Sequence, residues 1–126
     1  MFVLDNTTRT LELILDGAVA NNQLPYVTSY IDQFGGSEGS PGSKNGTSNS
    51  GTAVTIVAAP GREDVRRIIK FISVFNADTA NRTVNIRLND NSTTRIIASF
   101  VLATLEHLYY QDSVGFYAIT TAGAIK

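Results

Sequence analysis

The stretch Arg82–Ala103, RTVNIRLNDNSTTRIIASFVLA, decides the fold class. In its first part Val84, Ile86 and Leu88 alternate with polar residues, which is the period of a half-buried β-strand. The residues NDNS at 89–92 favour a turn, and the apolar-rich segment after them predicts a partner strand. The stretch therefore predicts an antiparallel hairpin.

Similar strand patterns recur along the chain, in RTLELIL (9–15), PYVTSYIDQF (25–34) and TAVTIVAA (52–59). The segment REDVRRIIKFISVFNAD (62–78) fits helical and strand spacing, but its β-branched and aromatic residues favour a buried strand. Strand signals at a spacing of roughly 8–12 residues are typical of sandwiches and small barrels. We therefore predict an all-β protein, a single antiparallel β-sandwich that is jelly-roll-like or Ig-like.

The chain has 126 residues, which predicts one domain over 1–126. Eleven of the seventeen residues in GGSEGSPGSKNGTSNSG (35–51) are Gly or Ser and none is apolar. Such a segment buries too little surface to offset its ordering entropy, so we expect a long flexible loop there. Residues 1–8 are expected to form either an N-terminal arm or an edge strand.

Composition argues against several function classes. The net charge of −1 provides no field for nucleic acid or a membrane surface, so neither is expected as a partner. Without cysteine the chain has no disulfide and no thiolate metal site, and we expect no cofactor. The sequence shows no secretion signal and no apolar run long enough to span a membrane.

The segment EHLYYQDSVGFYAITTAGAIK (106–126) contains the one histidine, His107, and is the strongest candidate for acid/base chemistry. Glu106 and His107 are neighbours in a strand, so their side chains point to opposite faces. Asp112 lies in the turn QDSVG, and no nucleophile motif is present. We therefore expect a strand–turn–strand hairpin and a protein that is not an enzyme.

Two further candidate sites each have a more ordinary explanation. Asp90, between two asparagines, offers oxygen ligands for calcium but lacks the spacing of a dedicated loop, so a turn is favoured. Five tyrosines could form a sugar-stacking platform or could serve as core and cross-strand pairs, which is the more common use: Tyr26, Tyr30, Tyr109, Tyr110 and Tyr117.

The one basic cluster comprises Arg62, Arg66, Arg67 and Lys70. The nearby acidic residues at 63 and 64 offset its charge, which favours an ordinary solvated face, with an acidic protein partner as the next interpretation.

The C-terminal half resembles a class of small virion proteins of tailed bacteriophages. The resemblance is one of layout, covers roughly residues 26–126, and rests on a set of features along the chain: Asn76, Val84–Leu88, Leu102–Tyr110, Gly115–Ile119 and Gly123–Lys126. Leu105 departs from the pattern, because a glycine-containing turn is expected before Glu106.

The resemblance implies a β-sandwich that acts as a capsid decoration, or cement, protein on the major capsid protein lattice. It also implies self-association as a dimer or trimer, assembly in the host cytoplasm, and a final place on the virion. A tail, fibre or head-tail component and, from another class, a carbohydrate-binding module stay open as alternatives. The candidate partner interface combines the apolar N-terminus with the arginine cluster: Phe2, Val3, Leu4, Arg62, Arg66 and Arg67.

Overall fold

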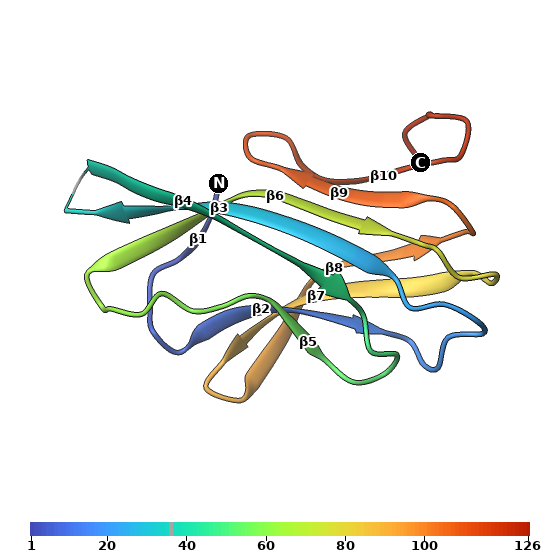
Figure 1. Ribbon diagram of the computed structural model, residues 1–126, viewed down its shortest axis with the longest axis horizontal. Helices are drawn as coiled ribbons and strands as arrows, with labels where there is room; N and C mark the ends of the chain where they lie inside the picture. The colour runs from blue at the N-terminus through green and yellow to red at the C-terminus, as the bar shows by residue number, and fades with distance from the viewer. Residues whose placement is uncertain (36) are drawn as a thin grey trace.

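The computed structural model describes residues 1–35 and 37–126, and all regular structure in that part of the chain is β-strand. Ten strands form two antiparallel sheets stacked face to face (Figure 1). Sheet A has the order β10-β9-β6-β3-β4, with β1 also paired to β6, and sheet B has the order β5-β2-β7-β8. The predicted all-β sandwich is confirmed.

The strand bounds follow the chain in order: β1 Phe2–Leu4, β2 Arg9–Leu15, β3 Pro25–Phe34, β4 Ser37–Thr47, β5 Val54–Val57, β6 Val65–Phe75, β7 Arg82–Asp90, β8 Thr93–Leu102, β9 His107–Gln111 and β10 Gly115–Ile119. The ambiguous segment at 62–78 is thus a strand, as predicted. The β7–β8 hairpin closes at Asn91 and Ser92, whose positive φ values of 51° and 73° suit a two-residue hairpin turn.

The core lies between the sheets and consists of the inward-facing residues of both. Leu11, Leu13 and Leu15 of β2 point inward, as their alternation predicts. Sheet A contributes Ile72 and Val74 of β6 from the other side. Because both sheets supply aliphatic side chains that are fully or almost fully buried, the sandwich has one continuous hydrophobic core.

The N-terminal segment packs on its own sandwich as an edge strand. β1 pairs antiparallel with β6 and places Phe2 opposite Ile69. Leu4 is fully buried in the core, which ties the segment down. Of the two structures expected for residues 1–8, the segment therefore forms the edge strand and not the arm.

Most of the segment expected to be a loop at 35–51 is strand β4, so that prediction is wrong over Ser37–Thr47. β4 pairs along its length with β3 and sets Gly42 opposite Tyr30 and Gly46 opposite Tyr26. A Cβ on Gly42 would lie 2.5 Å from the Tyr30 ring, and one on Gly46 would lie 3.0 Å from the Tyr26 hydroxyl. Each glycine therefore leaves free the space that a tyrosine ring of β3 occupies. The two rings supply apolar contacts that the side chains of β4 do not provide.

The expected C-terminal hairpin is confirmed as β9 and β10, paired from Gly115↔Gln111 to Ile119↔His107. The turn expected before Glu106 is also present, at residues 103–106. Leu105 stands there at φ 68°, the left-handed region in which glycine is relaxed, and its side chain is 55% exposed.

We predict that Leu105→Gly is more stable than Leu105→Ala by about 1 kcal/mol, because only glycine removes the Cβ that makes the left-handed conformation costly. Urea denaturation of both variants measures the difference. Neither change loses much packing, since the side chain is largely exposed. Equal stability of the two variants would contradict a left-handed backbone at Leu105.

Candidate binding surface

The residues singled out for acid/base chemistry lie apart. The Glu106 carboxylate is buried and accepts hydrogen bonds from Lys126 Nζ at 2.6 Å and from the Ala103 amide at 2.8 Å. Asp112 instead pairs with Lys70 at 3.0 Å. His107 points away from both, onto the outer face of sheet A, so the three side chains form no catalytic arrangement.

The candidate calcium residue Asp90 lies at the end of β7, beside the turn. Its carboxylate accepts hydrogen bonds from Thr8 Oγ1 at 2.7 Å and Arg9 Nε at 3.1 Å. These two donors lower its pKa. Within residues 1–35 and 37–126, no three His, Asp or Glu side chains are grouped so that they could hold a metal ion.

Asp78 organises one end of the sandwich. Its carboxylate is fully buried and accepts backbone hydrogen bonds from Ala20, Asn21, Asn22 and Thr79, at 2.8–3.2 Å. Arg82 Nε adds a fifth donor at 2.9 Å. The carboxylate therefore fixes the loop between β2 and β3 to the start of β7, which is a structural role.

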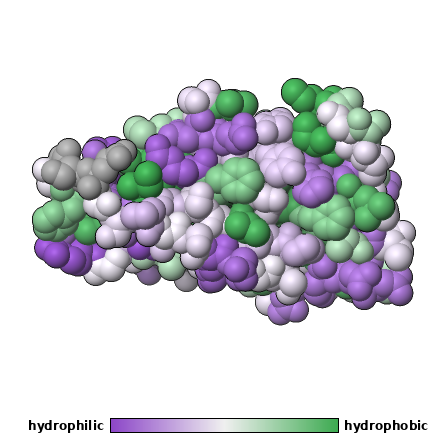
Figure 2. Space-filling view, turned by 45° about the horizontal axis from the view of Figure 1, so that its top comes forward, coloured by the Kyte–Doolittle hydropathy of each residue, from purple (hydrophilic) through white to green (hydrophobic). Residues whose placement is uncertain are grey.

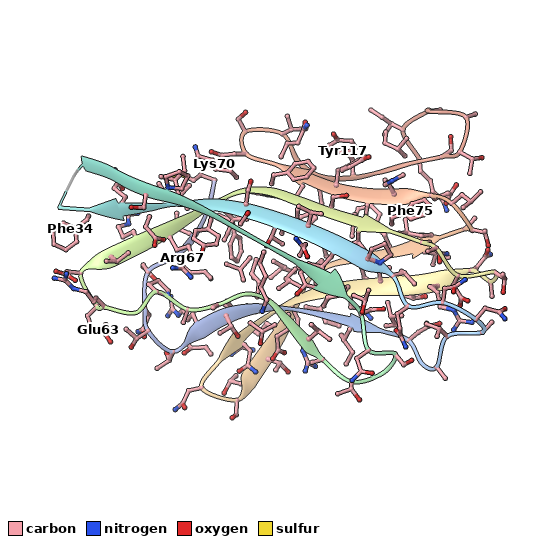
Figure 3. The ribbon with its side chains drawn as sticks, in the orientation of Figure 1. Phe34, Glu63, Arg67, Lys70, Phe75 and Tyr117 are labelled. Carbon is pink, nitrogen blue, oxygen red and sulfur yellow. The ribbon has the colours of Figure 1, made fainter. Side chains whose placement is uncertain are left out.

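Arg67 organises the other end, between the two sheets (Figure 3). Its guanidinium makes a bidentate pair with Asp32 at 2.8 and 3.0 Å and donates to the Ala58 carbonyl at 2.9 Å. The same group lies 4.1 Å above the centre of the Tyr30 ring. The side chain is only 12% exposed, so Arg67 holds the fold together and offers a partner little surface.

The other residues of the predicted partner interface differ in what they expose. Leu4 has no exposed surface, while Phe2 and Val3 are half-buried. Arg62 is exposed, pairs with Asp64 at 2.7 Å and lies over the Phe34 ring. Arg66 is exposed at the end of β6. Of the six predicted interface residues, Leu4 therefore has no surface for a partner to contact, and Arg67 has very little.

The outer faces of the two sheets differ sharply in chemistry. On sheet B the central strand β7 presents Thr83, Asn85 and Arg87, and Arg87 pairs with Glu12 of β2 at 2.7 Å. Its apolar residues are isolated aliphatic ones such as Val101. This is the ordinary alternation of a sheet with one solvated face.

The outer face of sheet A carries a contact series of five rings, the aromatic ladder: Phe71 and Phe75 of β6, His107 and Tyr109 of β9, and Tyr117 of β10. Phe75 lies 4.5 Å from His107 between ring centres, and His107 stacks on Tyr109 at 5.3 Å with an interplanar angle of 4°. Tyr117 follows Tyr109 at 5.7 Å. Figure 3 places Tyr117 on the side of sheet A away from sheet B.

The strand register extends the ladder into four rows across this face. They run Phe75–His107–Ile119; Asn45–Val27–Ser73–Tyr109–Tyr117; Ser43–Ser29–Phe71–Gln111–Gly115; and Pro41–Ile31–Ile68–Val3. These four rows hold no Asp, Glu, Lys or Arg, and the exposed Arg66, opposite Gln33, follows on the same face beyond the fourth row. Figure 2 turns this side toward the viewer and shows green, apolar side chains recurring among pale and purple ones. The outer face of sheet A is therefore the candidate binding surface.

His107 is the one imidazole in this surface, and its environment is hydrophobic. Its ring stacks on Tyr109 and contacts Phe75, and burial lowers its pKa below the ordinary value. No carboxylate hydrogen-bonds to it in the described part of the chain. The imidazole is therefore a neutral member of the ladder at pH 7.

The tyrosines do not form one platform. Tyr26 and Tyr110 are buried in the core, and Tyr30 lies on the inner face under Arg67. Only Tyr109 and Tyr117 point outward from sheet A. The sugar platform built from all five is therefore wrong.

Sequence reasoning missed Phe71 and Phe75 as surface residues, although a signal was present. The run IIKFISVF in β6 is apolar on both faces, a pattern of strands covered on both sides. The pairing of β3 with β6 has a bulge, between Ser29↔Phe71 and Tyr30↔Ile69. The bulge shifts the alternation of β6, so that Ile69 faces the core while Phe71 and Phe75 face outward. No sequence pattern marks that bulge.

A shallow hollow adjoins the ladder at the β10 edge and extends the apolar surface. It is lined by Gln111, Val114, Phe116, Tyr117, Ile119 and Ile125. Val114 and Ile125 are 66% and 74% exposed, which is high for aliphatic residues.

Comparisons with protein-family models, curated proteins and solved structures find no match for this chain. The fold and the surface describe a small β-sandwich that carries an aromatic ladder on the outer face of sheet A. The resemblance to phage virion proteins stays a prediction. None of the described residues belongs to a helix long and apolar enough to cross a membrane.

Proposed function

We propose that this protein is a non-enzymatic virion structural protein, a capsid decoration protein that binds the lattice of the major capsid protein. The observation that carries the proposal is the aromatic ladder on the outer face of sheet A, set in four rows that contain no charged residue. Such a face suits contact with another protein, since core positions of protein interfaces are enriched in aromatic residues and depleted in charged ones.

The titratable groups support the same proposal, because most of those weighed as chemical candidates are engaged in holding the fold. Asp78, Glu106 and Arg67 each form several internal hydrogen bonds. An inert, internally braced sandwich that offers a surface is what a decoration protein requires. The resemblance in layout to phage virion proteins, which is a prediction from the sequence, favours a capsid protein as the partner.

We predict that purified particles of the corresponding virus contain this protein at a copy number of the same order as the major capsid protein. Quantitative mass spectrometry of the particles measures that ratio, with the capsid protein as internal standard. A few copies to a few tens would reject decoration in favour of a tail or head-tail role. Absence from the particle would reject a virion role altogether.

A further inference from the structure

We infer that the outer face of sheet A binds a second copy of this chain, in a face-to-face dimer. The inference deepens the proposed function by naming the partner of that face, and it rests on the proposal only in treating the face as a protein contact.

β6, the central strand of sheet A, has apolar residues on both of its faces. Ile72 and Val74 fill the core on one side, while Phe71 and Phe75 stand on the other. On the outer side Phe71, Ser73 and Phe75 are only half-buried in the single chain. A second sheet packed over them would bury further apolar surface, which favours association.

The four rows of this face hold no charged residue. Lys70 lies between two of the rows on β6 and is neutralised by Asp112 at 3.0 Å, and the exposed Arg66, opposite Gln33, lies beyond the fourth row. A nucleic acid or a strongly charged protein would find nothing to pair with inside the rows. A second copy would bring no charge into the rows, and the Arg66 side chains of the two copies would lie at the end of the contact, where solvent screens them.

The outer face of sheet A is also complementary to itself. Aromatic rings gather on the β9 and β10 side of β6, whereas the aliphatic Val27 and Ile31 lie on the β3 side. In a dimer whose two-fold axis lies between the copies and runs parallel to β6, the β6 strands of the two copies stack on each other. Because the rotation reverses the order of the strands, β3 of each copy then lies over β9 of the other. Val27, which is 47% exposed, then meets the ladder near Tyr109.

The area of this face also suits a dimer. Five strands at ~4.8 Å and four rows at ~6.8 Å span a plane of about 600 Å². The accessible area of a face covered with side chains exceeds its plane, and a standard interface buries ~800 Å² per partner. The outer face of sheet A is thus large enough for a dimer.

The ring geometry favours a protein over a sugar as the occupant. A sugar stacks on an exposed ring face, but the rings of the ladder pack on one another: His107 stacks on Tyr109 at 5.3 Å, and Phe75 is tilted against His107 at 4.5 Å. The rings therefore offer a sugar less free ring face than isolated aromatic side chains would. Packed rings and aliphatic side chains suit contact with another sheet.

Sedimentation equilibrium of the purified chain tests the inference. At about 100 µM, a concentration that populates even a weak complex, we expect an apparent mass of twice 13.6 kDa. Val27→Glu and Tyr109→Glu, which each place a charge in the contact, should weaken association at least about tenfold. Asn85→Glu, on the outer face of sheet B, is the matched control and should associate like the wild type.

Val27 is already partly exposed, so its variant should fold, and circular dichroism checks this. A wild type that is monomeric throughout would overturn the inference. A dimer unaffected by Val27→Glu would also overturn it, because the contact would then lie on another face. A monomer that binds a glycan array and loses binding with Tyr109→Glu would replace it with a sugar site. A dimer through this face in a protein absent from particles would leave the inference standing and reject the virion role.

Discussion

Asp78→Asn should lower the melting temperature by about 10 °C at pH 7, a large change for a domain of this size. The substitution keeps the shape of the side chain and removes its charge. Calorimetry or thermal circular dichroism measures the effect.

The physical reason is the number of donors that converge on one buried carboxylate. Ala20, Asn21 and Asn22 point their amides at it from the loop before β3, and Arg82 donates from β7. An asparagine amide presents N–H groups where only acceptors fit. Buried donors would therefore lose their partners, which costs more than a typical hydrogen bond contributes.

The pH dependence gives the same prediction a second readout. Burial by itself raises the pKa of Asp78, but the backbone N–H donors outweigh it and hold the pKa well below its usual range. A carboxyl with a depressed pKa in the folded state stabilises the fold fully above its unfolded value of about 3.9. The contribution is lost as pH falls from there toward the folded pKa.

The melting-temperature difference between wild type and Asp78→Asn should therefore be constant from pH 7 to about pH 5 and shrink below about pH 4. Asp64→Asn is the control, since that carboxylate is 54% exposed and pairs only at the surface. It should change the melting temperature little at any pH. A difference that stayed constant down to pH 2 would show that the charge of Asp78 is not what the loop needs.

The sequence predicted the strands wherever apolar residues alternate, because alternation reports directly which side of a sheet is buried. Leu11, Leu13 and Leu15 are the clearest example, and Val84 and Ile86 pair with the same strand from β7. What it could not predict depends on contacts between distant segments. Asp78 reads as an ordinary turn residue until the loop at 20–22 is folded against it.

The candidate surface was partly predictable for a related reason. His107 stands out as the one histidine, but its role depends on Phe75 and Tyr109, whose rings the sheet places against it. Composition misled at β4, where Gly and Ser indicated a loop. The glycines are there because tyrosine rings of β3 occupy the space of their side chains.

Gly42→Val should destabilise the fold by about 2 kcal/mol, although valine favours strands and position 42 lies in one. A Cβ at Gly42 would lie 2.5 Å from Cζ of Tyr30 and 2.6 Å from its hydroxyl. The ring cannot move aside freely, because the Arg67 guanidinium covers it at 4.1 Å and is itself held by Asp32. Urea denaturation measures the loss.

Thr47→Val is the matched control, because it puts the same residue on the same strand with an exposed side chain and lies outside the four rows of the candidate binding surface. It should change stability by no more than about 0.5 kcal/mol. A double-mutant cycle with Tyr30→Ala makes the test specific. If the ring causes the clash, Gly42→Val costs much less once the ring is gone, so the two changes are strongly non-additive. If the effects of Gly42→Val and Tyr30→Ala on stability are additive, the Tyr30 ring does not pack against Gly42. Another contact would then hold β4 in the sheet.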